Sequence, residues 1–381
     1  MLKFFSRSKT KTDSLITDVA HTKAGHFHSL KVADIKHETA DCVSVAFELT
    51  PELHDTYKFV PGQYLTIRRF FNGEDVRRSY SICSSPLSGE LRVAIKKVEN
   101  GLFSTYANEE LKVGDELDVM SPMGHFVLEP NENNENTYVA FAAGSGITPI
   151  MSIMKSVIEL EPKSQFILIY GNRNSNSVIF KEELDDLKSA NLNRLEVHHI
   201  LSREDQGSDL LYGRIDGAKV AECGKQFFAP INVAGYYLCG PIDMINAARE
   251  TLAGVGVEKE RIHYELFTSA GVKDKIDHSK DQEAPQSKIT SSVTVILDGD
   301  ETHLEMVSDG RAILDAALDA GADVPYACKG AVCCTCRAKV LEGSATMEMN
   351  YALMDDEVED GYILTCQSHP TSERVVVSYD E

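Results

Sequence analysis

The chain has 381 residues, of which 43% are apolar and 25% are charged, and its formal net charge is −21 at pH 7. This composition is that of a globular protein with enough chain for two or three domains. No apolar run approaches the roughly 18 residues that a membrane span needs, and no basic stripe is present that would neutralise nucleic-acid phosphates. We therefore expect neither a membrane nor a nucleic acid as partner.

The first predicted unit is an N-terminal arm followed by a domain of short strands. The opening MLKFFSRSKTK is basic, and its apolar piece is too short for a secretory signal, so residues 1–25 are predicted to form a disordered arm. Residues 26–131 contain short alternating stretches such as SLKVADIKHE, QYLTIRRF and LRVAIKKVE, separated by turn signals such as NGED. Many short strands with little helix predict an antiparallel β-barrel.

The pattern changes to alternating strands and helices over residues 132–268. Apolar strands such as QFILIYGN, RLEVHHIL and YYLCGP alternate with helical stretches such as KEELDDLKSA and MINAARETLAGVG. This alternation predicts an α/β domain, with a parallel sheet covered by helices on both faces.

The end of the chain is a third unit. Residues 269–288 are polar and have no periodicity, which predicts a linker. Residues 289–381 open with a candidate hairpin, SVTVILDGDETHLEMV, and a helix, RAILDAALDAGA. They hold 18 acidic against 5 basic residues, so about −13 of the net charge lies here. Such an acidic face suits a basic protein partner, although solubility alone also accounts for it.

Four cysteines of this unit have the spacing of iron–sulfur ligands. Cys328, Cys333 and Cys336 form C-x4-C-x2-C, and Cys366 follows at a distance. This is the plant-type [2Fe–2S] spacing, whereas a structural zinc site usually pairs two C-x2-C steps and only one is present. Cys334 lies out of register and is predicted to be a small buried residue. Nine cysteines, an odd number, together with the lack of a secretory signal predict a reducing, cytoplasmic location.

With these cysteines, the segment from Val293 to Tyr379 resembles a plant-type ferredoxin domain, which implies an α+β β-grasp fold. Three stretches of the barrel segment, RRSYSICSS, NGLFSTY and SPMGHF, resemble flavin-binding motifs of the ferredoxin–NADP⁺ reductase family. An arginine can clamp a pyrophosphate bidentately, and a tyrosine offers a flat face to the flavin ring. The resemblance implies FAD rather than FMN. It assigns to the flavin Arg78, Tyr80, Ser81, Gly101, Ser104, Pro122, Gly124 and Phe126.

Two stretches of the α/β segment resemble the nucleotide-binding signatures of the same family. AAGSGITPIMS joins a predicted strand to a helix, where glycines let the backbone approach a pyrophosphate and the helix N-terminus favours its charge. Proline replaces the last glycine of the general fingerprint, as it does in this family. YYLCGPIDM implies that Cys239 lies against the nicotinamide, the alternative being an inert core thiol. The residues assigned to the nucleotide are Gly144, Gly146, Thr148, Pro149, Cys239, Gly240 and Pro241.

The choice between NADPH and NADH depends on two short stretches. Ser202 and Arg203 stand where the NADP-dependent members of the family bind the 2′-phosphate, and Arg173 is a second cation after a strand. No acidic residue there is placed like the ribose-binding carboxylate of NAD-selective folds. NADPH is favoured over NADH, the alternative being that either arginine is simply solvated. By resemblance, Glu265 and Phe267 provide an acid and an aromatic ring near the flavin.

Three cofactor sites in this order make an electron relay. NADPH gives up two electrons as hydride, a [2Fe–2S] cluster accepts one at a time, and FAD mediates between them. The residues expected to act in the hydride step are Tyr80, Ser81, Cys239 and Glu265.

The whole chain resembles reductase components with a C-terminal ferredoxin domain, which pass electrons to a partner oxygenase. The stretches VPYACKGAVCCTCRAKVLEG and MEMNYAL carry a closer resemblance within this group, which implies a di-iron oxygenase as that partner. The alternatives are another acceptor, namely a Rieske oxygenase, a desaturase or a hybrid-cluster protein, or a redox-sensing module without turnover.

Overall fold

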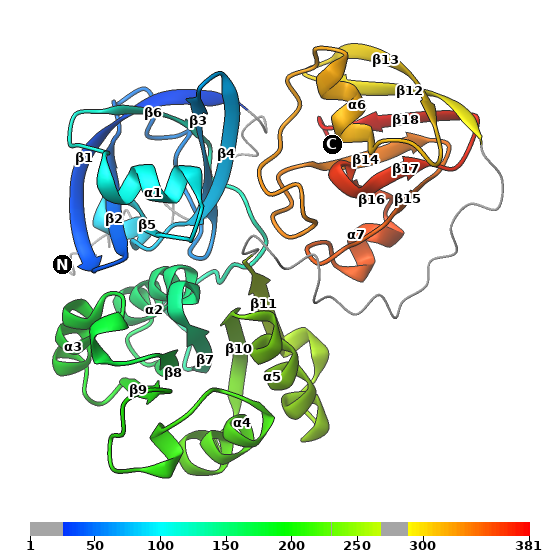
Figure 1. Ribbon diagram of the computed structural model, residues 1–381. Coiled ribbons are helices and arrows are strands. Elements are labelled where there is room, and N and C mark those ends of the chain that lie inside the picture. The colour runs from blue at the N-terminus through cyan, green and yellow to red at the C-terminus, as the bar shows by residue number, and fades with distance from the viewer. Residues whose placement is uncertain (1–25, 230, 268–288) are drawn as a thin grey trace, which may run out of the picture.

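The structure, a computed structural model, describes residues 26–229, 231–267 and 289–381. The predicted arm at 1–25 and the predicted linker at 269–288 lie outside these residues. Figure 1 shows three lobes, which we call the barrel lobe (26–131), the α/β lobe (132–267) and the C-terminal lobe (289–381). Within the described ranges, no helix is both long enough and apolar enough to span a bilayer.

The barrel lobe is a six-stranded antiparallel sheet, as its alternating sequence predicts. Its strands pair in the order β4-β3-β6-β1-β2-β5. An isolated bridge between Ile82, just after β4, and Val93 in β5 joins the two edges, which closes the sheet into a barrel. The strands are β1 (Phe27–Thr39), β2 (Cys42–Glu48), β3 (Tyr64–Phe71), β4 (Glu74–Ser81), β5 (Leu91–Lys96) and β6 (Glu116–Met120).

One helix of the barrel lobe is not predicted from the sequence. Helix α1 (Leu102–Glu109) lies between β5 and β6, where only a turn is expected. It buries Phe103, Tyr106 and Ala107 against the barrel core. This i, i+3, i+4 spacing is the helical signal in the sequence, but one short face of three residues is easily taken for part of a loop.

The α/β lobe has the predicted doubly wound architecture. Its parallel strands, in the order β11-β10-β7-β8-β9, are β7 (Thr137–Ala143), β8 (Gln165–Asn172), β9 (Leu195–Leu201), β10 (Val233–Gly240) and β11 (Ile262–Leu266). Alternate residues of β7 face opposite sides: Ala140 packs with α2 (Ile147–Leu160) and α3 (Lys181–Ala190), while Phe141 packs with α4 (Gly217–Cys223) and α5 (Ile242–Gly254). The strand order reverses between β7 and β10, so a crevice for ligands is expected at their carboxyl ends.

The C-terminal lobe is a mixed sheet with two short helices, which confirms the predicted α+β class. The strands β13-β12-β18-β14-β16 form one sheet, in which β12 and β18 are parallel, and β15 pairs with β17. The predicted hairpin is present, with left-handed backbone at Asp298 (φ 54°) and Gly299 (φ 81°) in its turn. The elements are β12 (Thr290–Leu297), β13 (Asp300–Val307), α6 (Ile313–Asp319), β14 (Arg337–Glu342), β15 (Ala345–Met347), α7 (Asp355–Glu359), β16 (Tyr362–Leu364), β17 (Ser368–Pro370) and β18 (Arg374–Ser378).

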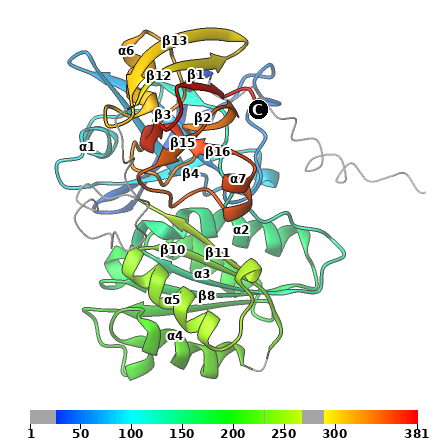
Figure 2. The same cartoon turned by 90° about the vertical axis from the view of Figure 1, so that its right-hand side faces the viewer.

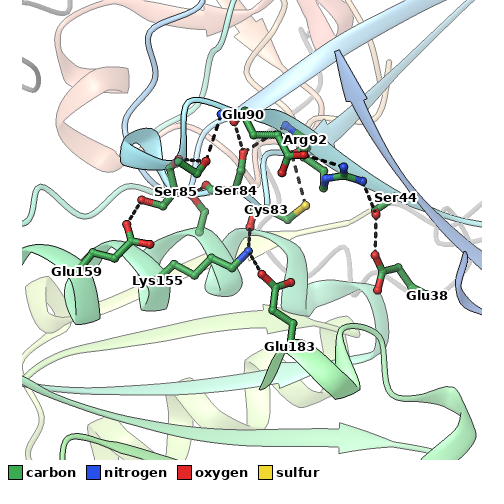
Figure 3. Close-up of polar contacts among 12 residues, drawn as sticks. Glu38, Ser44, Cys83, Ser84, Ser85, Glu90, Arg92, Lys155, Glu159 and Glu183 are labelled. Atoms are coloured by element: carbon green, nitrogen blue, oxygen red, sulfur yellow. Dashed lines mark hydrogen bonds and ion pairs between the residues drawn. The ribbon is translucent and has the colours of Figure 1, made fainter. Parts of the chain in front are cut away.

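The barrel lobe contacts both other lobes. Helix α2 packs beneath it, and Figure 3 shows the Lys155 ammonium between the Cys83 carbonyl of the barrel (3.3 Å) and the Glu183 carboxylate of α3 (2.5 Å). Buried barrel residues such as Cys83 and Leu128 belong to the same hydrophobic cluster as α2. The C-terminal lobe lies beside β3 and β4 (Figures 1 and 2). Strands β3 and β4 therefore lie close to the cysteine-rich lobe.

Candidate functional site

The predicted flavin strand β4 presents an arginine and a tyrosine on one face. Arg78 and Tyr80 are two residues apart and so point to the same side of the strand. The Arg78 side chain is exposed and donates a hydrogen bond to the Arg77 carbonyl (2.7 Å), and no carboxylate of the described ranges pairs with it. The Tyr80 ring lies 5.7 Å from that of Phe103, centroid to centroid. An uncompensated guanidinium next to a half-buried aromatic ring fits a flavin with its pyrophosphate.

The second flavin motif forms the N-terminus of α1. The Ser104 hydroxyl accepts a hydrogen bond from the Val98 amide (3.1 Å) and donates one to the Gly101 carbonyl (3.3 Å). A Cβ at Gly101 would lie 2.5 Å from that hydroxyl oxygen, so glycine allows this tight turn. The motif therefore ends in a helix N-terminus, whose free amides favour an anion.

The residues of the third flavin motif pack at two different positions in the structure. Gly124 (φ 120°) lies under the ring of Tyr64, where a Cβ would approach a ring carbon to 2.9 Å. The preceding Pro122 is partly exposed. Phe126 is buried in the cluster shared with α2, and its ring meets that of Tyr237 edge-on at 5.8 Å. Gly124 is thus packed against a barrel strand, and Phe126 joins the barrel to the α/β lobe.

The glycine turn after β7 lies at the predicted crevice. Gly146 starts α2 so close to β10 that a Cβ would lie 2.1 Å from the Cys239 carbonyl oxygen. The hydroxyl of Tyr170 donates to the Gly144 carbonyl (3.0 Å), and that of Thr148 donates to the Ser145 carbonyl (3.0 Å). Pro149 follows in the first turn of α2, where its missing N–H costs nothing. This turn brings a helix N-terminus to the carboxyl ends of two adjacent strands, which suits a pyrophosphate.

The two arginines proposed for the nucleotide are neighbours. The Arg203 amide donates to the Arg173 carbonyl (2.8 Å) where β8 and β9 end, and the Ser202 amide donates to Asn172 (2.9 Å). Both arginine side chains are exposed and have no ion-pair partner among the described residues. The next acid, Glu204, accepts from the Ser175 amide (2.8 Å), and this bond lowers the pKa of Glu204. Two unpaired cations at one edge of the sheet fit a phosphate.

The barrel and α/β lobes meet at three of the residues predicted for the hydride step. The Ser81 hydroxyl, in β4, donates to the Glu265 carboxylate of β11 at 3.0 Å, and Glu265 pairs in register with Cys239 of β10. Burial raises the pKa of Glu265 to about 8, against the Ser81 hydrogen bond. Burial likewise raises the pKa of the Cys239 thiol well above its usual range, so this sulfur is neutral.

The other residues of this region have packing roles in the structure. Gly240 (φ 158°) leaves no room for a Cβ, which would lie 2.8 Å from the Met244 methyl carbon, and Pro241 precedes α5. Phe267 packs against the cluster around α2. Tyr80, the fourth residue predicted for the hydride step, is on the barrel strand that carries Ser81.

The four predicted cluster cysteines converge as two pairs of thiols. Cys328 contacts Cys333, and Cys336 contacts Cys366. The Gly330 amide points at the Cys328 sulfur (3.2 Å). The Cys333 thiol and then backbone amides lower the pKa of Cys328 to about 6.

The residues around these thiols suit an iron–sulfur cluster. Two pairs of thiols, with a backbone amide aimed at sulfur, fit the ligand set that the plant-type spacing predicts. Among the described residues, no three His, Cys, Asp or Glu side chains are placed to hold one ion.

The loop that carries these cysteines has an uncommon backbone. Lys329 (φ 48°), Ala331 (φ 63°) and Cys334 (φ 51°) are all left-handed, a conformation that costs a non-glycine residue roughly 1 kcal/mol. The Cys334 side chain is buried in the core of the C-terminal lobe, as its position out of register predicts, and burial raises its thiol pKa. The turn at Cys334 thereby separates a core thiol from the cluster thiols on either side.

Two contacts at this site are missed by sequence reasoning. The Tyr64 hydroxyl donates to the Cys333 carbonyl, and Arg77 pairs with Asp323 (2.9 Å). Both link the barrel lobe to the C-terminal lobe across about 250 positions or more. Neither residue belongs to a motif, so no local signal marks them.

Three protein-family models match the chain. Residues 29–128 match an oxidoreductase FAD-binding domain, residues 141–250 an oxidoreductase NAD-binding domain, and residues 295–371 a 2Fe-2S iron-sulfur cluster binding domain. The three matches follow the order of the lobes.

Similar proteins match this chain over nearly their whole length. The chain is 45% identical to one of the subunits of 1,2-phenylacetyl-CoA epoxidase from Escherichia coli (strain K12), over 93% of this chain and 98% of that protein. It is 34% identical to the ferredoxin reductase component of 3-ketosteroid-9-alpha-monooxygenase from Mycobacterium tuberculosis, over 93% and 97%. The solved structure of phthalate dioxygenase reductase has the same fold, with a TM-score of 0.56 and 22% identity over 92% of this chain and 98% of that one.

Proposed function

This chain belongs to the family of oxygenase reductase components that join FAD-binding, NAD-binding and 2Fe-2S domains in one polypeptide, and we propose that it serves an oxygenase that epoxidises phenylacetyl-CoA. As a member of this family it is an oxidoreductase that transfers electrons. The proposal adds the source of the electrons, NADPH, the residues that handle them and the acceptor, a di-iron oxygenase.

One observation carries the proposal: strands β3 and β4 of the barrel contact both other lobes. Ser81 at the end of β4 bonds to Glu265 of the α/β lobe (3.0 Å), and its register partner Tyr64 in β3 bonds to the loop of Cys333. A flavin held by Arg78 and Tyr80 would lie between the nucleotide and the cluster. When bound, the flavin takes up hydride and releases single electrons, and the cluster accepts them one at a time.

The protein groups have separate tasks in this proposal. Arg78 and the N-terminus of α1 hold the flavin pyrophosphate, and the turn at Gly144–Gly146 holds that of the nucleotide. Ser81 and the protonated Glu265 form a neutral hydrogen-bonded pair at the junction of the two lobes, with the neutral Cys239 thiol beside them. Such a pair orients the reacting rings without placing a charge next to the transferred hydride.

The proposal also names the nucleotide, NADPH, and the compartment, the cytoplasm. The unpaired Arg173 and Arg203 support NADPH, because a 2′-phosphate would satisfy both guanidinium groups. All nine cysteines lie among the described residues and none forms a disulfide, which suits the reducing cytoplasm.

Steady-state reduction of cytochrome c by the FAD- and cluster-loaded protein tests the proposal. We expect turnover with NADPH and a lower kcat/KM with NADH. Arg203→Gln should reduce this preference and leave the NADH rate unchanged. Absence of turnover with both nucleotides would refute the reductase function. To test the acceptor, purified phenylacetyl-CoA oxygenase should be reduced by this protein and NADPH, and failure there, with cytochrome c still reduced, would exclude that acceptor alone.

A further inference from the structure

Tyr64 lies between the flavin-binding strands and the cluster loop. It is the first residue of β3, and its main chain pairs with Met123 through two hydrogen bonds of 2.8 and 3.0 Å. The side chain is only 4% exposed, and its ring lies over Gly124, which has no Cβ to obstruct it. The ring is therefore fixed by the barrel lobe before it meets any residue of the C-terminal lobe.

The hydroxyl of Tyr64 reaches two residues of the cluster loop. It donates to the Cys333 carbonyl, and it lies 3.0 Å from the Thr335 hydroxyl, which can donate back to it. These two residues flank Cys334, the left-handed residue of the turn between two cluster ligands. One phenol thus bonds to both sides of a costly turn.

A second contact fixes the chain just before the cluster loop. The Arg77 guanidinium, 3% exposed, donates to the Val324 carbonyl (3.4 Å) and lies 4.2 Å over the ring of Tyr326. The small apolar cluster around Tyr64 consists of Ala327 and Cys333, with Met123 and Cys328 packed against it. The loop is therefore docked on the barrel on both sides of its first cysteine.

We propose that Tyr64 is a positioning residue that braces the cluster loop from another domain, so that the loop takes its final geometry only when the C-terminal lobe is docked on the barrel. The geometry around Cys333 then depends on docking, and the environment of the cluster changes between the docked and undocked arrangements. This inference rests on the proposed electron transfer, but it concerns the loop and is testable without NADPH.

The test is Tyr64→Phe in the full-length, FAD- and cluster-loaded protein, with Tyr57→Phe as the matched control. Tyr57 is also buried in the barrel, and its hydroxyl donates to the Val119 carbonyl (2.6 Å) and lies 3.3 Å from the His28 ring, both in the barrel lobe. The first measurement is the EPR spectrum and midpoint potential of the dithionite-reduced cluster. The second is the cluster-reduction phase after rapid mixing with NADPH, read apart from flavin reduction.

In Tyr64→Phe we expect shifted g-values and a shifted potential, together with a cluster-reduction phase slower by about fivefold, the factor that loss of one hydrogen bond predicts. Flavin reduction and the Tyr57→Phe protein should match the wild type. Thr335→Val, which removes the second partner, should produce the same spectral shift, and combining the two changes should add little.

The inference is wrong if Tyr64→Phe has the wild-type spectrum and cluster-reduction rate, or if Tyr57→Phe shifts both equally. Should Tyr64→Phe lose the cluster on purification while keeping FAD, a brace is supported. If Tyr64→Phe loses FAD as well, the test uses Thr335→Val instead. A wild-type EPR spectrum of the cluster in Thr335→Val would then overturn the inference. Failure of the proposed function looks different: no reduction of the wild-type cluster by NADPH, with a normal dithionite spectrum.

Discussion

The barrel makes two interfaces that differ in kind. Toward the α/β lobe it shares one continuous hydrophobic cluster, in which Leu128 of the barrel packs with Ile150 and Met154 of α2. Toward the C-terminal lobe, the described contacts include the small apolar cluster around Tyr64 and the ion pairs Arg77–Asp323 and His125–Glu357. A shared core holds two domains as one unit, whereas a small polar interface allows them to separate.

The difference matches what the two electron steps require. Hydride transfer needs the two rings held in one geometry, which a shared core ensures. The cluster must receive an electron from inside the molecule and deliver it to another protein, so a contact of modest strength is suitable.

The largest expected effect is loss of the cluster, with the interface between the barrel and α/β lobes left intact. Cys366→Ser should abolish the visible absorption of the cluster, because one iron loses a thiolate, while NADPH still reduces FAD. Absorbance and EPR spectra of the purified protein measure this. Cys334→Ala, at the neighbouring core cysteine, should keep the cluster. A normal cluster in Cys366→Ser would refute the ligand assignment.

A cavity in the shared core should destabilise the barrel and α/β lobes together. Leu128 is 5% exposed, and Leu128→Ala should lower the free energy of unfolding by about 2–5 kcal/mol. Urea denaturation, followed by flavin fluorescence and by circular dichroism, should show one shared transition at lower urea. Two separate transitions would mean that these lobes do not share a core.

Loss of the buried cation should weaken the smaller interface. Arg77→Met removes the contacts to Asp323 (2.9 Å) and Val324, so amide exchange over residues 323–336 should rise about 5- to 30-fold, the effect of 1–2 kcal/mol. The urea transition of the other two lobes should also shift, because Arg77 pairs with Asp75 (2.9 Å) within the barrel. Lys259→Ala breaks an exposed ion pair with Asp355 and should change exchange little. Unchanged exchange in Arg77→Met would remove Arg77 from the docking contact.

The last effect concerns pH at the junction of the barrel and α/β lobes. Burial raises the pKa of Glu265 from 4.5 to about 8, so the folded protein keeps a proton that the unfolded chain releases. The free energy of unfolding should therefore decline as pH rises from about 4.5 to 8, and the contribution is fully present only below this window. Glu265→Gln should flatten part of the slope in urea denaturation at several pH values. An equal slope in both proteins would show that Glu265 is ionised at neutral pH.

Much of the fold follows from periodicity, and the exceptions have physical causes. The alternation of QYLTIRRF and the helical period after AAGSG predict β3 and α2 because each element has a buried face that repeats along the chain. Helix α1 is missed because it spans only two turns. The motifs locate Arg78, Gly146 and the cysteines Cys328, Cys333 and Cys336, because each motif occupies a short continuous stretch of the sequence.

Contacts between lobes are not predictable in this way. Tyr64 and Cys333 are 269 positions apart, and Arg77 and Asp323 are 246 apart. Nothing in the sequence around Tyr64 distinguishes it from any other aromatic residue of a strand. Such residues become visible only when the packing of one lobe against another is known.

Rapid mixing of the FAD- and cluster-loaded protein with one equivalent of NADPH tests the central claim most directly. The account predicts that the flavin absorption is lost first and that the cluster is then reduced, within the same molecule and at a rate independent of protein concentration. A flavin that is reduced while the cluster stays oxidised, or a second phase that accelerates with protein concentration, would contradict it.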